Sequence, residues 1–121
     1  MYRLGIIEES IDNKNVLCRL ASYFVSQRIE NVSEDEYPVW HINEYQVVEH
    51  KITDVADRLK QHIKETRYCH AFSEDKLLVA LKGKWFEISL KSDETWNEMI
   101  EYGAVHANVE RRYLETISLH I

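Results

Sequence analysis

Two residues that could do chemistry together, Cys69 and His70, are neighbours in the segment RYCHAF, residues 67–72. A thiol beside an imidazole suggests a nucleophile and its base, and both side chains also bind metals. The segment has a strand pattern, however, and adjacent side chains of a strand point to opposite faces of the sheet. The two groups are therefore not expected to share a proton or a metal ion. We expect His70 on the core face as a hydrogen-bonded structural residue, and Cys69 as filling on the other face.

The segment WHINEY, residues 40–45, supplies a second set of chemical groups. Alternation along a strand places His41 and Tyr45 on one face and Glu44 on the other. A small acid/base enzyme could use these three side chains in a pocket at the edge of the sheet. The same residues suit an ordinary strand with a mixed solvent-exposed face, and the sequence favours that interpretation.

Metal and cofactor motifs are absent from the sequence. Zinc ligands usually occur in short pairs such as C-x2-C or H-E-x-x-H, and the chain has none. The six histidines are scattered: His41, His50, His62, His70, His106 and His120. The segment KGK, residues 82–84, lacks the glycine spacing and the following helix of a phosphate-binding loop. We expect no metal site and no cofactor.

Composition narrows the class of protein and its partners. The 121 residues suffice for one domain, and we expect a single α+β domain over residues 1–121. The net charge is −6 and Lys and Arg do not cluster, so nucleic acid is not expected as a partner. No apolar stretch approaches the length of a membrane span, and Glu8 and Glu9 interrupt any signal-peptide pattern. With only Cys18 and Cys69, both expected to be reduced and buried, the sequence predicts a cytoplasmic protein without membrane contact.

Hydrophobic spacing predicts the element order β-α-β-α-β-β-β-α. The predicted elements are a strand over 2–8, a helix from the cap Asp12 to about Ile29, a strand over 39–48, a helix over 52–63, three strands within 68–90, and a helix from Ser92 or Asp93 that ends at Gly103. Asn108 is expected to cap one further turn over 109–113, and residues 116–121 to form a short strand or a tail. This order is typical of a two-layer sandwich, with one mixed or antiparallel sheet and helices mainly on one face.

The three-stranded meander within 68–90 has two distinct faces. Tight turns at 73–76 and 83–84 predict His70 opposite Val79, and Val79 opposite Ile88. The core face carries the larger apolar residues: Phe72, Leu77, Val79, Leu81, Phe86, Ile88 and Leu90. The other face carries a tryptophan among small apolar residues, with charged residues at its margin: Ala71, Leu78, Ala80, Trp85, Lys82 and Glu87.

The face around Trp85 has the composition of a partner-binding surface, with an aromatic anchor and a charged rim. The same pattern is expected if the helix over 92–103 folds across it, and the sequence does not separate the two possibilities. A second candidate surface is acidic: Glu34, Asp35 and Glu36 lie in a loop that suits a basic partner.

Our leading hypothesis is a non-enzymatic protein-interaction module that forms a homodimer or docks on a protein partner. An acidic immunity protein that neutralises a basic toxin would be one example. The alternative is the small acid/base enzyme that uses His41, Tyr45 and Glu44.

Four segments together resemble a group of small, uncharacterised bacterial proteins of similar length. They are the strand W-H-I-x-E-Y at residues 40–45, the strand and hairpin from Tyr68 to Leu77, the hairpin ALKGKWFEI at residues 80–88, and the helix that ends in Tyr102-Gly103. The resemblance covers most of the chain and implies a bacterial cytosolic protein with one compact domain. It implies no activity and no catalytic residue.

Overall fold

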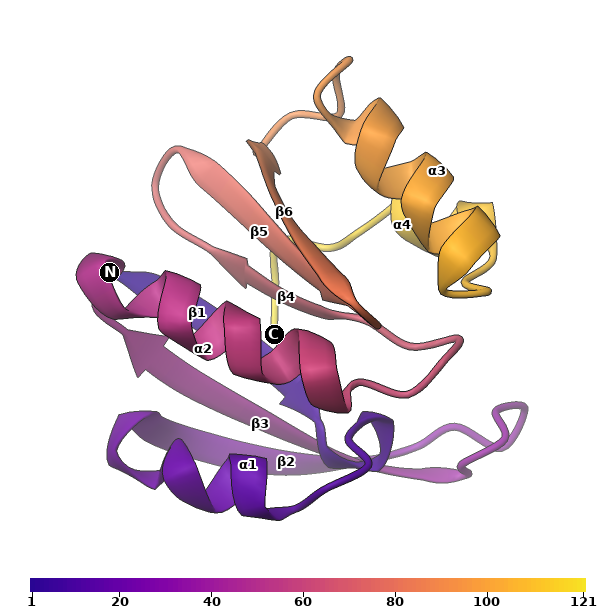
Figure 1. Cartoon of the computed structure of the whole chain (residues 1–121). Coiled ribbons are helices and arrows are strands. Elements are labelled where there is room, and N and C mark those ends of the chain that lie inside the picture. The colour runs from indigo at the N-terminus through magenta and orange to yellow at the C-terminus, as the bar shows by residue number, and fades with distance from the viewer.

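The computed structural model describes residues 1–121 and contains a six-stranded antiparallel sheet with the strand order β2-β3-β1-β4-β5-β6 (Figure 1). The strands are β1 (Tyr2–Ile7), β2 (Phe24–Asn31), β3 (Val39–Val47), β4 (Cys69–Phe72), β5 (Lys76–Leu81) and β6 (Lys84–Ser89). The helices are α1 (Asn15–Arg19), α2 (Glu49–His62), α3 (Trp96–His106) and α4 (Arg111–Glu115), with 3₁₀ turns η1 (Glu8–Ser10) and η2 (Ala21–Tyr23). No helix has both the length and the apolar character that crossing a membrane requires. The predicted α+β class with one antiparallel sheet is confirmed.

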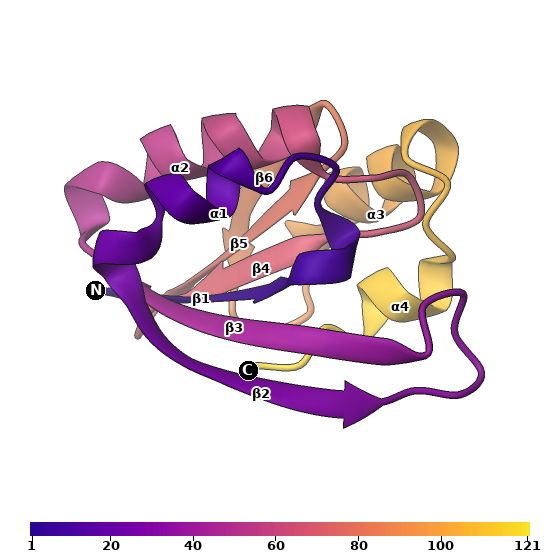
Figure 2. The same ribbon diagram turned by 90° about the horizontal axis from the view of Figure 1, so that it is seen from below.

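Helices cover both faces of the sheet, not mainly one as predicted. The helices α1 and α2 lie on one face, and α3 and α4 lie on the other, over β5 and β6 (Figures 1 and 2). The reason is that β5 is apolar on both sides, with Leu78 and Ala80 in the α2 layer and Leu77 and Val79 in the α3 layer. A strand of this kind needs cover on both faces.

The chain from Phe24 to Asn31 is the strand β2, where the sequence predicted the second half of a helix. The helical spacing of apolar residues stops at Phe24, because positions 27 and 28 are Gln and Arg. The segment instead pairs antiparallel with the outer edge of β3 and satisfies the backbone hydrogen bonds of that edge. The pairing ends with Asn31 opposite Val39. Only α1 remains of the predicted helix, so the observed order has an additional strand before β3.

The meander β4-β5-β6 has the predicted faces and a partly different register. His70 lies opposite Val79, as predicted. In the next hairpin Val79 lies opposite Phe86 instead of Ile88, because the two-residue turn is formed by residues 82–83, one position earlier than the predicted turn at 83–84. Gly83 permits this two-residue turn, since its φ of 92° is in the left-handed region that favours glycine. The shift of two residues keeps each side chain on its predicted face.

The helix α3 continues through Gly103, where the sequence predicted its end. A Cβ atom at Gly103 would overlap the side chain of Leu114 in α4 and lie 3.4 Å from Leu81. Gly103 therefore marks close packing between α3 and α4, not a helix end. The helix α4 begins at Arg111, later than the predicted turn over 109–113, and residues 116–121 form a tail without strand pairing.

Gly103→Val is expected to lower the free energy of unfolding by about 2 kcal/mol, because overpacking of a close contact costs about 1–3 kcal/mol. Urea denaturation measures the change. Val105→Ala is the matched control, since Val105 is an exposed side chain of the same helix, and its effect should stay within about 0.5 kcal/mol. A Gly103→Val protein as stable as the wild type would contradict the close contact with Leu114.

Candidate functional site

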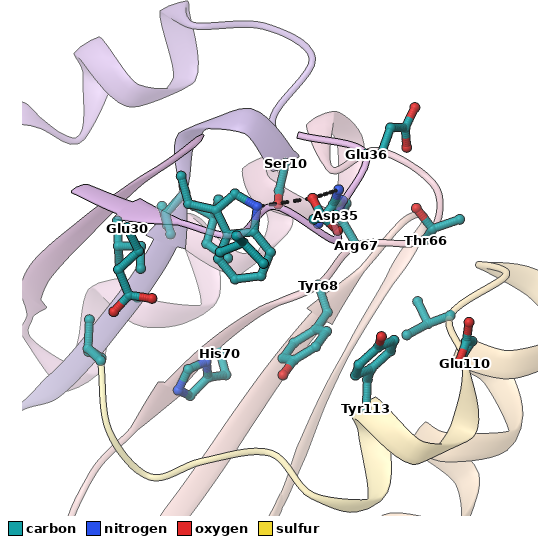
Figure 3. Close-up of a pocket in the computed structure, with 18 of the residues that line it drawn as sticks. Ser10, Glu30, Asp35, Glu36, Thr66, Arg67, Tyr68, His70, Glu110 and Tyr113 are labelled. Atoms are coloured by element: carbon teal, nitrogen blue, oxygen red, sulfur yellow. Dashed lines mark hydrogen bonds and ion pairs between the residues drawn. The ribbon is translucent and has the colours of Figure 1, made fainter. Parts of the chain in front are cut away.

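A cleft of about 690 Å³ lies on the side of the sheet opposite α1 and α2, beside the part that α3 and α4 cover (Figure 3). Its floor comes from β1, β3 and β4, and its walls come from the β2–β3 loop, the segment before β4, α4 and the C-terminal tail. The apolar and aromatic residues that line it include Ile7, Trp40, Ile42, Tyr68, Val109 and Tyr113. The volume falls in the range of ordinary ligand-binding pockets.

Asp35 anchors the β2–β3 loop beside the cleft. Its Oδ2 accepts hydrogen bonds from Nη2 of Arg67 at 2.6 Å, from the backbone N–H of Tyr37 at 2.9 Å and from Nε1 of Trp40 at 3.0 Å. Two of these bonds are drawn in Figure 3. Burial opposes ionisation of Asp35, but the hydrogen bonds from Arg67, Tyr37 and Trp40 outweigh it and lower the pKa to about 2. The carboxylate is therefore a charged structural anchor, not a free docking group.

The unpaired charge at the rim of the cleft is negative. Each arginine that lines the cleft is paired with a carboxylate: Arg67 with Asp35, Arg28 with Glu30, and Arg112 with Glu110. Glu34 and Glu36 are exposed, line the same cleft, and have neither a hydrogen-bond nor an ion-pair partner. These two carboxylates can therefore receive a cation that enters the cleft.

The C-terminal tail closes one end of the cleft beside His70. Nε2 of His70 lies 3.1 Å from the backbone oxygen of His120, so this nitrogen carries the proton. Burial lowers the pKa of His70 although backbone hydrogen bonds oppose the shift, which favours the neutral imidazole. Ile121 packs against β1, with its Cγ1 3.1 Å from the position of a Cβ on Gly5. His70 thus holds the tail as a hydrogen-bonded structural residue, in line with the expectation for it.

Cys69 lies on the opposite face of the sheet from His70, as predicted. It is buried in the layer under α2, and burial raises the pKa of its thiol to about 12. A thiol with this pKa stays protonated at neutral pH and is a poor nucleophile. Cys18 was predicted to be buried, and this is wrong, because the short helix α1 leaves its side chain exposed.

The predicted partner-binding face around Trp85 is covered by the chain's own helix α2. Its small apolar residues are at most 2% exposed: Ala71, Leu78 and Ala80. Trp85 is half-buried and donates a hydrogen bond from Nε1 to Asp57 of α2 at 2.8 Å. Lys82 and Glu87 at the margin stay exposed. The helix α2, and not the predicted helix over 92–103, occupies the place that the hypothesis gave to a partner.

The three candidate acid/base residues do not converge. Nδ1 of His41 lies 2.7 Å from Oε2 of Glu9, and Tyr45 is only 2% exposed in the α2 layer. Glu44 points to the other face and pairs with Arg3 at 2.9 Å. None of the three lines the cleft. No group of three or more His, Cys, Asp or Glu side chains is arranged to hold a metal ion.

Sequence reasoning missed the residues that build the cleft, apart from the acidic loop. Trp40, Arg67 and Tyr113 come from three distant segments, which only the fold brings together. The sequence held one partial indication of the cleft. Arg67 and Tyr68, which both line it, are the first two residues of the RYCHAF segment and directly precede the strand.

Comparisons with protein-family models, with curated proteins and with solved structures find no match to this chain. The resemblance to small bacterial proteins therefore stays a prediction. The chemistry of the cleft is what remains to indicate a function.

Proposed function

We propose that this chain is a non-enzymatic protein-interaction module that binds a basic segment of a protein partner in the cleft. The main support for the proposal is that the only unpaired charges at the rim of the cleft are carboxylates. The arginines of the rim are all neutralised by carboxylates, whereas Glu34 and Glu36 have no partner. A Lys or Arg side chain finds uncompensated carboxylates there, and an acidic ligand finds no free cation.

The dimensions and lining of the cleft suit a peptide segment with cationic and apolar side chains. Tyr68 provides aromatic surface within the cleft, on which a guanidinium or ammonium group gains cation–π attraction. Trp40 and Tyr113 add further aromatic surface, although each ring already lies beside an arginine of this chain, Arg67 and Arg112 respectively. The net charge of −6 attracts a basic partner from a distance and speeds its association. Neutralisation of a basic toxin by an immunity protein is one form that this function can take.

The test is an NMR titration with two synthetic peptides of equal length. One contains Lys, Arg and an aromatic residue, and the other carries Glu at each basic position. The basic peptide should shift the indole N–H signal of Trp40, with an affinity that falls as salt is added, because salt screens the attraction. The acidic peptide should leave this signal unchanged. Equal shifts with both peptides would contradict the proposal.

Glu34→Lys/Glu36→Lys is expected to weaken binding of the basic peptide about tenfold or more, because the variant replaces both free carboxylates with cations. Glu74→Lys/Glu94→Lys is the matched control, since it changes the net charge equally at exposed positions that do not line the cleft. The control should retain most of the affinity. If both double variants lose affinity equally, net charge and not the cleft determines binding.

A further inference from the structure

The strand β2 forms an unprotected edge of the sheet. All eight of its residues are exposed, and only β3 pairs with it. The opposite edge strand, β6, is capped at Ser89, whose N–H donates to Oγ1 of Thr95 at 3.0 Å and whose C=O accepts from Nε1 of Trp96 at 2.7 Å. No bond of this kind reaches β2. A long, uncapped edge strand is a template for pairing with another strand.

The backbone of β2 turns the N–H and C=O groups of Ile29 outward. The N–H of Val32 donates to the C=O of Pro38 at 2.8 Å, and this pair continues the β2–β3 register. Hydrogen-bonded pairs alternate along an antiparallel ladder, so Ile29, three residues earlier, belongs to the set that does not bond to β3. The residue opposite Ile29 is His41, and its N–H donates to Glu9 at 2.7 Å, so it points away from β2. This orientation supports the assignment, because Ile29 and His41 then form a pair without mutual backbone hydrogen bonds.

A two-fold axis through Ile29 makes the edge of β2 complementary to itself. Arg28 of one copy then lies opposite Glu30 of the second copy, and the converse pair forms at the same time. Gln27 lies opposite Asn31, so the outward backbone groups of one copy meet those of the other. Ile29, which is 60% exposed, meets its own symmetry copy and loses apolar contact with water. No other two-fold register of β2 places Arg28 opposite Glu30.

We propose that two copies of this chain associate by antiparallel pairing of β2 with β2, which continues the sheet from one copy into the other. The inference goes beyond the proposed function and does not rest on it. A two-fold axis of this kind is perpendicular to the sheet, so both clefts open on the same side of the dimer. Because one pair of strands buries a small area, the dimer is weak and its population rises with protein concentration.

Sedimentation velocity of the full chain over a range of concentrations tests the proposal. The wild type should show a reversible monomer–dimer equilibrium at micromolar to millimolar concentration. Arg28→Glu and Glu30→Arg should each weaken the dimer about tenfold or more, because two like-charged pairs then face each other. An equimolar mixture of the two variants should recover the dimer, because its facing pairs are again of opposite charge. Recovery in the mixture supports this register and is not expected of an interface elsewhere.

Ile29→Pro separates edge pairing from folding. It removes an outward N–H group and leaves the hydrogen bonds between β2 and β3 in place, which edge strands tolerate. The variant should remain monomeric with the circular dichroism spectrum of the wild type. A wild type that is monomeric at millimolar concentration, a dimer that persists in Arg28→Glu or in folded Ile29→Pro, or a mixture that fails to associate would each overturn the proposal.

Discussion

Asp35→Ala is expected to lower the free energy of unfolding by about 3 kcal/mol, because removal of one partner of a largely buried ion pair leaves the other charge uncompensated. The side chain of Arg67 is 12% exposed, and its Nε already lacks a hydrogen-bond partner. The indole N–H of Trp40 and the backbone N–H of Tyr37 lose the same acceptor. Urea denaturation followed by tryptophan fluorescence measures the loss.

Glu36→Ala is the matched control for this prediction, since Glu36 lies in the same loop with an exposed carboxylate that has no partner. Its effect should stay within about 0.5 kcal/mol. The double variant Asp35→Ala/Arg67→Ala should cost less than the sum of the two single variants, because neither charge is then left alone. Equal losses in Asp35→Ala and Glu36→Ala would show that the ion pair does not anchor the loop.

The same carboxylate makes the stability of the fold dependent on pH. The pKa of Asp35 falls from 3.8 to about 2 in the folded state, so the unfolded chain binds this proton more readily. The stability that Asp35 contributes is therefore fully present above about pH 4 and is lost as the pH falls towards 2. The shift corresponds to about 2 kcal/mol. The difference in unfolding free energy between the wild type and Asp35→Asn should shrink by this amount over that range, and a constant difference would contradict the assignment.

Leu59→Ala is expected to cost about 3 kcal/mol of unfolding free energy, because it leaves a cavity between α2 and the sheet. Leu59 is 1% exposed and belongs to the same buried layer as Leu78 and Ala80. Loss of this contact loosens α2 over the face around Trp85. Urea denaturation measures the cost, and binding of a hydrophobic dye reports the exposed apolar surface.

Arg58→Ala provides the comparison, since Arg58 is the exposed neighbour of Leu59 on the same helix. Its effect should stay within about 0.5 kcal/mol and should not increase dye binding. A cost below about 1 kcal/mol for Leu59→Ala would contradict the cover by α2. The face around Trp85 would then again be a candidate surface for a partner.

The elements that the sequence predicts best are those whose local signals agree with one another. In the meander, alternating side chains and a glycine at the turn both indicate hairpins, and His70 lies opposite Val79 as expected. In the strand β2 no local signal indicates a strand. Neither of its faces is buried, so its sequence lacks an alternating apolar pattern. Phe24 also continues the spacing of the preceding helix, which extends the helical prediction into the strand.

The arrangement of the layers and the cleft could not be predicted, because both depend on which segments meet in space. The apolar stripe of α2 was visible in the sequence, but its spacing does not say which face of the sheet it covers. For the cleft, the acidic loop was visible, but the partner of Asp35 is Arg67, which lies far along the chain. The sequence alone could not show that the carboxylate of Asp35 is paired while those of Glu34 and Glu36 are not.

The strand β1 precedes the other strands in sequence, yet it lies in the middle of the sheet between β3 and β4. Leu4 of β1 lies opposite Tyr45 on one side and Ala71 on the other, and no other strand joins the two halves of the sheet. Its pairing therefore requires segments that follow it by tens of residues. Closure of such long loops is slow, because their entropy is lost before the contacts form. The strand β1, which comes first in the chain, can thus complete its pairing only after both β3 and β4 are available. We expect this step to slow folding.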